Sequence, residues 1–297
     1  MSERRLKSFL RKVGIKSYLD LAMIDDDSLS YLSNVVDRLP HFKNKAIRTV
    51  EEESRYKFIN ALEILKKNKH VPTGVRGLDR LLGGGVEAGA ITEFVGEYGT
   101  GKTQLCHQLA VMARVERLGR VLYLDAEGTF RPERIVSISE ARGLDPEEAL
   151  ENTIYFKANS SDQLLEVLFA SKTLAANLKL ALLVFDGVTT LPHYEFSNRE
   201  DALRRRRKIR DIMVGLRELA WSGIAVVVTN RVVVVPEEER LEPVSGFITG
   251  LFSTHRLFLR KAARGVREVS VTFSPILPPR KAYFRVSEEG LIDVDEI

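Results

Sequence analysis

The stretch from Gly96 to Thr103, GEYGTGKT, constrains the fold of this chain more than any other feature of its 297 residues. It matches the pattern G-x-x-x-x-G-K-[ST], follows the strand-like run Ile91–Val95, and precedes the helical pattern TQLCHQLAV. A strand, a glycine turn and a helix in this order direct backbone N–H groups and a helix N-terminus toward phosphates. A chance glycine turn is the alternative, and it leaves the flanking context unexplained. The sequence therefore predicts a nucleotide-binding phosphate loop.

Two side chains of this loop carry the expected chemistry. Lys102 is placed to reach the terminal phosphates of ATP, and the Thr103 hydroxyl is placed to hold Mg²⁺. ATP and Mg²⁺ are therefore the predicted cofactors. The other predicted nucleotide-binding residues of the loop and its helix are Gly96, Glu97, Tyr98, Gly99, Thr100, Gly101 and Gln104.

Two further strand-like runs end in carboxylates. Asp186 ends LALLVFD and is predicted to complete the magnesium site, although an Asp at this position could instead cap a helix. The run VLYLDAEG offers Asp125 and Glu127. We assign Glu127 to the water that attacks the γ-phosphate, with an ordinary solvated turn glutamate as the alternative. Lys102 and Glu127 are thus the predicted catalytic residues.

The pattern of apolar residues predicts an α/β fold. Beyond PTGVRGLDRLLGGG, β-branched runs alternate with helical patterns, which indicates βαβ units and a buried parallel sheet. Three strand-like runs after Arg256 are expected to add antiparallel strands. Before Val71, apolar residues three and four apart indicate short helices. We predict a small helical domain over residues 1–55 and an α/β core over 56–297.

Composition excludes several classes of protein. A hydrophobic content of 44% supports a sizeable core and argues against global disorder. The net charge of +4 is a mild basic bias that is compatible with a polyanionic partner. Cys106 is the only cysteine, so an internal disulfide and a zinc site built from cysteines are excluded. Without an apolar run of about 18 residues or a signal peptide, a soluble cytosolic protein is expected, with no membrane partner.

Two longer stretches resemble a known family. PTGVRGLDRLLGGGVEAGAITEFVGEYGTGKTQLCHQLAV and YLDAEGTFRPERI are similar to the archaeal RadA and eukaryotic-type recombinases of the RecA superfamily, from about Phe58 to the C-terminus. The resemblance implies a RecA-like core and an ATP-driven protein that acts on DNA in recombination or repair. It also implies that Glu127 activates water and that Arg134 packs on the adenine.

The same resemblance implies assembly. Phe58 and Ala61 fit the family's F-x-x-A polymerisation motif, which plugs into the core of an adjacent subunit; an amphipathic helix that buries Phe58 on its own domain is the alternative. SPILPP, with Pro275 and Pro278, resembles the cap that reaches the neighbour's ATP. The expected partners are therefore further copies of this chain or a RadA recombinase.

Departures from the family cluster where DNA is expected to bind. Only KVGIKS remains of the helix-hairpin-helix domain near the N-terminus, so we expect a diverged docking module there. The first DNA loop would be TTLPHYEFSNRED, in which His193 replaces an arginine and Arg199 matches a basic residue. The helix LRRRRKIRDIMVGLRELA then offers Arg205 and Arg206 to phosphates, or is a solvated face. Trp221 is expected to anchor the end of that helix.

The second DNA loop departs further. Asn230 matches the family, but Arg231 replaces the glutamine that senses the γ-phosphate and relays it to the loop. The loop VVVVPEEERLEPVSG keeps Arg240 as its only basic residue, and residues 237–239 are glutamates that would repel phosphates. We assign Asn230 and Arg231 to γ-phosphate sensing, with Arg231 as a cation offered to that phosphate.

Three functions fit these observations. The first is a RadA-like paralogue that hydrolyses ATP and binds single-stranded DNA, with double-stranded DNA as a further candidate. The second is a full strand-exchange recombinase that forms filaments, in which the basic helix compensates for the acidic loop. The third is a regulatory protein that docks on the recombinase through Phe58 and Ala61 and has little affinity for DNA.

Overall fold

The computed structural model separates the chain into two compact units, residues 1–67 and residues 68–297. It describes residues 10, 12, 15, 20–21, 24, 30, 32–33, 39–53, 61–62, 69–116, 118–235 and 240–294. The predicted domain boundary near residue 55 and Phe58 of the polymerisation motif lie outside the described residues. Both therefore stay predictions.

The N-terminal unit has its own small core. Helix α4 (Leu39–Glu53) buries Leu39 and Ala46, which are seven residues apart and therefore lie on one face of the helix. Leu10 and Leu21 pack with them. Further along the chain, Ala61 lies in a helical segment and is exposed.

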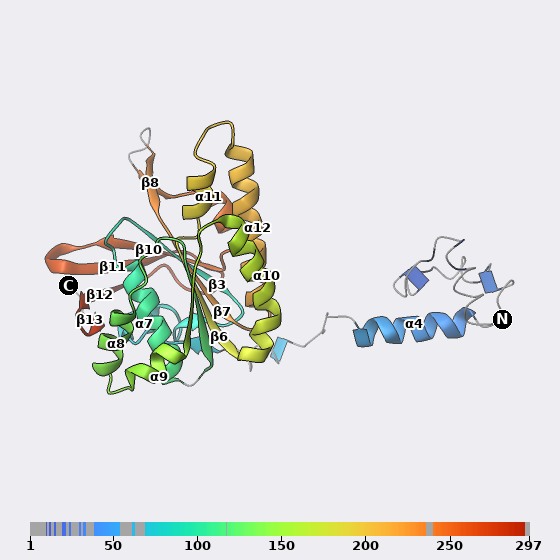
Figure 1. Ribbon diagram of the computed structural model, residues 1–297, viewed down its shortest axis with the longest axis horizontal. Helices are drawn as coiled ribbons and strands as arrows, with labels where there is room; N and C mark the ends of the chain where they lie inside the picture. The colour runs from blue at the N-terminus through green and yellow to red at the C-terminus, as the bar shows by residue number, and fades with distance from the viewer. Residues whose placement is uncertain are drawn as a thin grey trace. The chain divides into compact units, whose positions relative to one another are not determined.

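The larger unit is built on a nine-stranded sheet of order β13-β12-β11-β10-β3-β7-β6-β4-β5 (Figure 1). Adjacent strands from β10 to β5 are parallel, and the strands from β10 to β13 pair antiparallel. This confirms the predicted α/β fold with antiparallel C-terminal strands. The strands are β3 (Ile91–Gly96), β4 (Arg120–Asp125), β5 (Thr153–Lys157), β6 (Leu180–Asp186), β7 (Ala225–Asn230), β10 (His255–Lys261), β11 (Val266–Phe273), β12 (Lys281–Ser287) and β13 (Gly290–Asp293).

Helices cover both faces of the sheet because its central strands are apolar on both sides. Along β7, Val227 packs in one core cluster, whereas Val226 and Val228 pack in the other. One face carries α6 (Arg76–Leu81), α7 (Lys102–Val115), α8 (Pro132–Glu140) and α9 (Pro146–Glu151). The opposite face carries α10 (Ser161–Leu178), α11 (Thr190–Glu195) and α12 (Ala202–Trp221) (Figure 1).

The segments predicted as DNA loops contain regular structure. The first segment contains helix α11. In the second segment, the strands β8 (Val232–Val235) and β9 (Arg240–Pro243) pair as an antiparallel hairpin, and α13 (Gly246–Gly250) follows. The four residues between the hairpin strands lie outside the described part. A two-stranded sheet, β1 (His70–Val71) with β2 (Val86–Glu87), and the 3₁₀ turn Ala263–Gly265 complete the unit. Within the described residues, no helix is long and apolar enough to cross a membrane.

Candidate functional site

The phosphate loop joins the buried end of β3 to the start of α7. Gly99 and Gly101 have φ values of +75° and +98°, which side chains with a Cβ rarely adopt. At Gly96 a Cβ would lie 2.5 Å from the Leu259 carbonyl oxygen, so only glycine fits there. The Thr100 hydroxyl donates to the Glu97 carbonyl oxygen at 2.9 Å and closes the loop. Backbone N–H groups at the start of the 14-residue helix α7 are thereby available for an anion.

Lys102 bridges the loop from its far end. Its Nζ donates to the carbonyl oxygens of Gly96 at 2.7 Å and Glu97 at 2.9 Å. Burial lowers the pKa of Lys102, and the nearby carboxylates of Glu127 and Asp186 work against that shift. The structure therefore holds this cation at the mouth of the loop, where a phosphate can take over the two carbonyl contacts.

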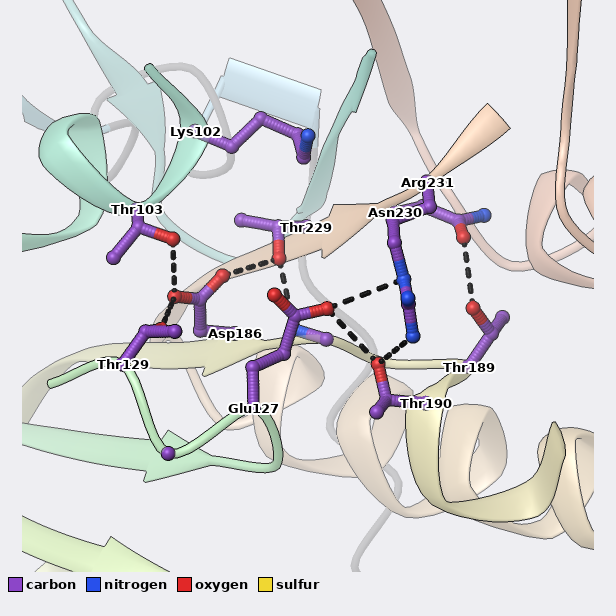
Figure 2. A network of polar contacts seen from close by, with 12 residues as sticks. Lys102, Thr103, Glu127, Thr129, Asp186, Thr189, Thr190, Thr229, Asn230 and Arg231 are labelled. Atoms are coloured by element: carbon purple, nitrogen blue, oxygen red, sulfur yellow. Dashed lines mark hydrogen bonds and ion pairs between the residues drawn. The ribbon is translucent and has the colours of Figure 1, made fainter. Parts of the chain in front are cut away.

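Asp186, at the end of β6, collects four hydroxyl groups. Its Oδ2 accepts from Thr103 at 2.7 Å and from Thr129 at 3.3 Å (Figure 2). The same oxygen of Asp186 accepts from Tyr123 at 3.4 Å. Its Oδ1 accepts from Thr229 at 2.5 Å. All of these bonds go to side chains, so the alternative of a helix cap does not describe this carboxylate.

Thr103 and Asp186 also fit the donor set of a magnesium site. Mg²⁺ in nucleotide sites is usually held by one or two protein oxygens together with phosphates and water. Among the residues that the structure describes, no group of three or more His, Cys, Asp or Glu side chains could hold a metal ion. The hydroxyl–carboxylate pair at the phosphate loop is therefore suited to an ion that arrives with a nucleotide.

The two carboxylates after β4 have different environments. Asp125 accepts backbone N–H bonds from Glu127 at 2.9 Å, Gly128 at 2.7 Å and Phe130 at 3.0 Å, so it shapes the turn. Glu127 instead projects to the opening of about 260 Å³ beside the phosphate loop. Gly187 makes room for it, because a Cβ at that position would lie 2.6 Å from the Glu127 Cγ. The structure places Glu127 where the sequence predicted it, at the rim of the site.

Glu127 belongs to a closed triangle with Thr190 and Arg231 (Figure 2). Glu127 Oε1 lies 3.3 Å from Arg231 Nε and accepts from the Thr190 hydroxyl at 3.1 Å. The same hydroxyl accepts from Arg231 Nη2 at 3.1 Å. Arg231 also lines the opening next to the phosphate loop. The residue that replaces the family's glutamine thus sits directly on the carboxylate predicted to activate water.

Asn230 points away from the opening into a buried network. Its Nδ2 donates to Glu93 Oε1 and to the Val244 carbonyl oxygen, both at 2.9 Å. Glu93, fully buried on β3, is compensated by Arg256 at 2.7 Å and by the Ser253 hydroxyl at 2.9 Å. This network was not predicted from the sequence, in which the signal for it is an acidic residue inside the apolar run ITEFVG. Asn230 therefore connects β3 to the far arm of the β8–β9 hairpin, and its part in γ-phosphate sensing stays a prediction.

Arg134 and Pro278, both predicted to contact ATP, have different surroundings in the structure. Arg134, on α8, donates to Gln104 Oε1 at 2.8 Å and to the carbonyl oxygens of Ser287 at 2.9 Å and Glu288 at 2.7 Å. It thereby joins the phosphate-loop helix to the turn after β12. Pro278 is exposed in the segment between β11 and β12 and is not among the residues that line the opening at the phosphate loop. The adenine contact and the cap over a neighbour's ATP remain predictions.

The four predicted DNA-binding arginines have unequal surroundings. Arg199 and Arg206 are exposed. Arg205 is half-buried and donates to the Phe196 carbonyl oxygen at 2.5 Å, and Arg240 pairs with Glu242 at 2.5 Å. His193 lies near them and contacts the Ser245 hydroxyl at 3.0 Å; burial, then Arg205 and Arg231, lowers the pKa of His193. Two of the four side chains are therefore accessible to a polyanion, and two already make polar contacts within the part of the chain that the structure describes.

Known proteins resemble this chain over most of its length. The sequence profile of the Rad51 family matches residues 66–294. The chain is 38% identical over 235 residues to the DNA repair protein RAD51 of Mycosarcoma maydis, which covers 75% of this chain and 69% of that protein. It is 38% identical over 247 residues to the DNA repair protein RAD51 homolog B of Zea mays, a match that spans 79% of this chain and 72% of that protein. It is 40% identical over 236 residues to the DNA repair protein RAD51 of Saccharomyces cerevisiae (75% and 59%).

Proposed function

Because the chain belongs to the Rad51 family, we propose that it is an ATP-hydrolysing, DNA-binding protein of homologous recombination and DNA repair. More specifically, we propose a paralogue resembling archaeal RadA that binds single-stranded DNA. The observation that supports ATP chemistry best is the Thr103–Asp186 contact of 2.7 Å at the mouth of the phosphate loop, with Glu127 beside the same opening. The names of the relatives support a role in DNA repair.

Lys102, Thr103 and Asp186 would hold the triphosphate and its ion. In this proposal Lys102 exchanges the two loop carbonyls for terminal phosphate oxygens and remains charged there. Thr103 and Asp186 supply a hydroxyl and a carboxylate oxygen to Mg²⁺, which, when bound, neutralises charge on the phosphates. Thr229, Thr129 and Tyr123 orient the Asp186 carboxylate through hydroxyl bonds. The β6 strand end is thereby fixed before any nucleotide arrives.

Glu127 would orient water and accept its proton. A general base must lie within hydrogen-bonding reach of that water and be free to accept, yet here Thr190 and Arg231 both contact Glu127 Oε1. We propose that the Arg231 guanidinium leaves Glu127 and pairs with the γ-phosphate, which frees the Glu127 carboxylate. An Arg231→Gln protein is then expected to lose most of its hydrolysis while still binding ATP. Unchanged turnover in that variant would reject this role for Arg231.

DNA binding is proposed for the exposed arginines near α12. Arg199 and Arg206 are accessible, whereas the hairpin contributes Arg240 already paired with Glu242. A hairpin with so little free positive charge favours the paralogue over a recombinase that exchanges strands alone. The two alternatives predict other properties. A full recombinase would form filaments and exchange strands. A regulatory protein would dock on a RadA recombinase and would itself have little affinity for DNA.

The decisive experiment measures ATP turnover by the full chain with and without single-stranded DNA, alongside electron microscopy for filaments. A paralogue is expected to show stimulation by DNA without long filaments. Stimulation with filaments identifies a recombinase, and turnover indifferent to DNA identifies the docking protein. Lack of any ATP and Mg²⁺ uptake by folded protein in calorimetry would overturn the proposal as a whole.

A further inference from the structure

A second depression, which we name the arginine groove, runs along α12 on the side of α13. Its volume is about 410 Å³, and it lies apart from the opening at the phosphate loop. Its lining combines four cations with an aliphatic and aromatic floor and contains no carboxylate. The lining residues are Arg206, Arg207, Arg210, Arg217, Ile248, Leu251 and Phe252.

Arg217 lines the groove, and two aromatic rings hold its guanidinium in place. Its guanidinium carbon lies 4.9 Å from the ring centroid of Trp221 and 4.7 Å from that of Phe252. These two contacts orient the planar cation. The buried Arg217 Nε has no hydrogen-bond partner among the described residues. The covered Nε cannot be reached from outside, so an arriving carboxylate would pair with the Nη groups of the same guanidinium.

Exposed apolar side chains lie in the groove and beside it. Phe247 and Leu251, four residues apart and therefore on one face, have exposed fractions of 82% and 64%. Trp221 is 71% exposed, so the expectation that it anchors the end of α12 in the core is wrong; it stacks on Arg217 at the surface instead. Several large apolar side chains next to one cluster of arginines mark a surface that gains free energy when an apolar partner covers it.

We propose that the arginine groove docks an acidic, amphipathic segment of a partner protein. Leucine or phenylalanine side chains of that segment would cover Ile248 and Leu251, and its flanking carboxylates would pair with Arg206, Arg210 and Arg217. Arg210 already pairs with the neighbouring Asp211 at 2.8 Å, so the other three arginines of the lining, Arg206, Arg207 and Arg217, carry most of the available charge.

The composition of the floor favours a protein segment over a nucleic acid strand. Single strands are held by cations together with aromatic rings whose faces are free to stack on bases. The aromatic residue of the lining is Phe252, which packs against the core on one side and against Arg217 on the other. Trp221, beside the groove, already has one ring face on Arg217. The remaining floor, Ile248 and Leu251, is aliphatic and offers nothing to phosphates. Apolar side chains of a peptide, in contrast, would pack on this aliphatic floor.

Fluorescence anisotropy with the full chain tests the proposal. The probe is a fluorescein-labelled peptide of about 16 residues, with Leu and Phe at helical spacing between Asp and Glu. We expect Leu251→Ser to weaken its binding at least fivefold, because the apolar floor is removed, and Arg217→Gln to weaken it about tenfold. Arg80→Gln, at an exposed arginine on α6 outside the groove, is the matched control and should leave binding unchanged.

Three results would overturn the proposal. One is equal binding of a control peptide in which Ser replaces each Leu and Phe, since that would show attraction to charge alone. Another is an equal loss of binding to labelled oligothymidylate in the Leu251→Ser variant, which would make the groove a nucleic acid surface. The third is absence of peptide binding at about 100 μM. Arg207→Gln, at an exposed groove position that is not among the arginines predicted to bind DNA, serves as a second variant if Leu251→Ser melts at a lower temperature than wild type.

Discussion

The nucleotide rim and the arginine side of α12 use polar residues in opposite ways. At the nucleotide rim, Asp186 accepts from four hydroxyls and Asp125 from three backbone N–H groups. Along α12, by contrast, Arg206 is exposed, and the Nε of Arg217 has no partner among the described residues. One region is satisfied internally, and the other keeps polar groups available for a partner.

This difference fits the ligands that we propose for each region. Phosphoryl transfer depends on atoms held within a fraction of an ångström, so preorganised hydrogen bonds at the rim serve catalysis directly. Binding of a polyanion or an acidic segment depends on unpaired charge that reaches a flexible partner. The Arg231–Glu127 pair stands between the two cases, because a cation from the hairpin side is held by a carboxylate of the nucleotide rim.

The largest expected effect tests the rim itself. Glu127→Gln should lower ATP turnover by about 10²–10⁴-fold, because the amide cannot accept the proton of water. Calorimetry should still detect ATP and Mg²⁺ binding, since Lys102, Thr103 and Asp186 are intact. Glu133→Gln, at an exposed carboxylate on α8 that does not line the opening, is the matched control. A decrease smaller than about threefold would remove Glu127 from the reaction.

A smaller effect separates shaping of the rim from chemistry. Asp125→Ala leaves three backbone N–H groups without their acceptor and should destabilise the protein by about 2–3 kcal/mol. Thermal melting is expected to shift down by about 5–10 °C. Asp145→Ala, which removes the cap that accepts from Glu147 N at the start of α9, should cost about 1 kcal/mol. Equal shifts in the two variants would contradict the preorganised rim.

On the arginine side, charge reversal should act on binding and not on stability. Arg206→Glu is expected to weaken single-stranded DNA binding about tenfold and to reduce the salt slope by about 0.7 for each phosphate that the side chain no longer neutralises. Arg205→Gln should act more weakly, because its guanidinium is already bound to the Phe196 carbonyl. Filter binding over a salt series measures both, with Arg80→Glu as the control. If Arg205→Gln proved the stronger change, the assignment of free and engaged arginines would be reversed.

The smallest effect concerns the link between α11 and the end of the hairpin. The lowered pKa of His193 means that the folded protein favours the neutral ring. As pH falls below the ordinary value of 6.5, the unfolded chain gains a proton that the folded chain resists, so stability decreases toward acid. His193→Gln should therefore reduce the drop in melting temperature between about pH 7.5 and 5.5 by a few degrees. An identical pH dependence in both proteins would show that His193 does not contribute.

The backbone structure was predictable from the sequence where it depends on contiguous residues. The phosphate loop, the strand ends at Asp186 and Asn230, and the α/β pattern were predictable because backbone conformation follows from local spacing and glycine. The prediction for Trp221 was wrong: an aromatic residue at the end of an amphipathic helix suggests burial, but in the tertiary structure this ring is 71% exposed. The buried Glu93 was also missed, because its compensating Arg256 lies 163 residues away.

The sequence by itself determined that this chain builds a phosphate loop between a buried strand and a helix, since eight consecutive residues encode that turn. Only the tertiary structure decided which side chains meet there. Thr103 and Asp186, 83 residues apart, become partners because α7 begins above the ends of parallel strands. Arg231 reaches Glu127 from a different strand end for the same reason. Local sequence determines the backbone conformation at each site, whereas the order of the strands in the sheet determines which side chains come into contact.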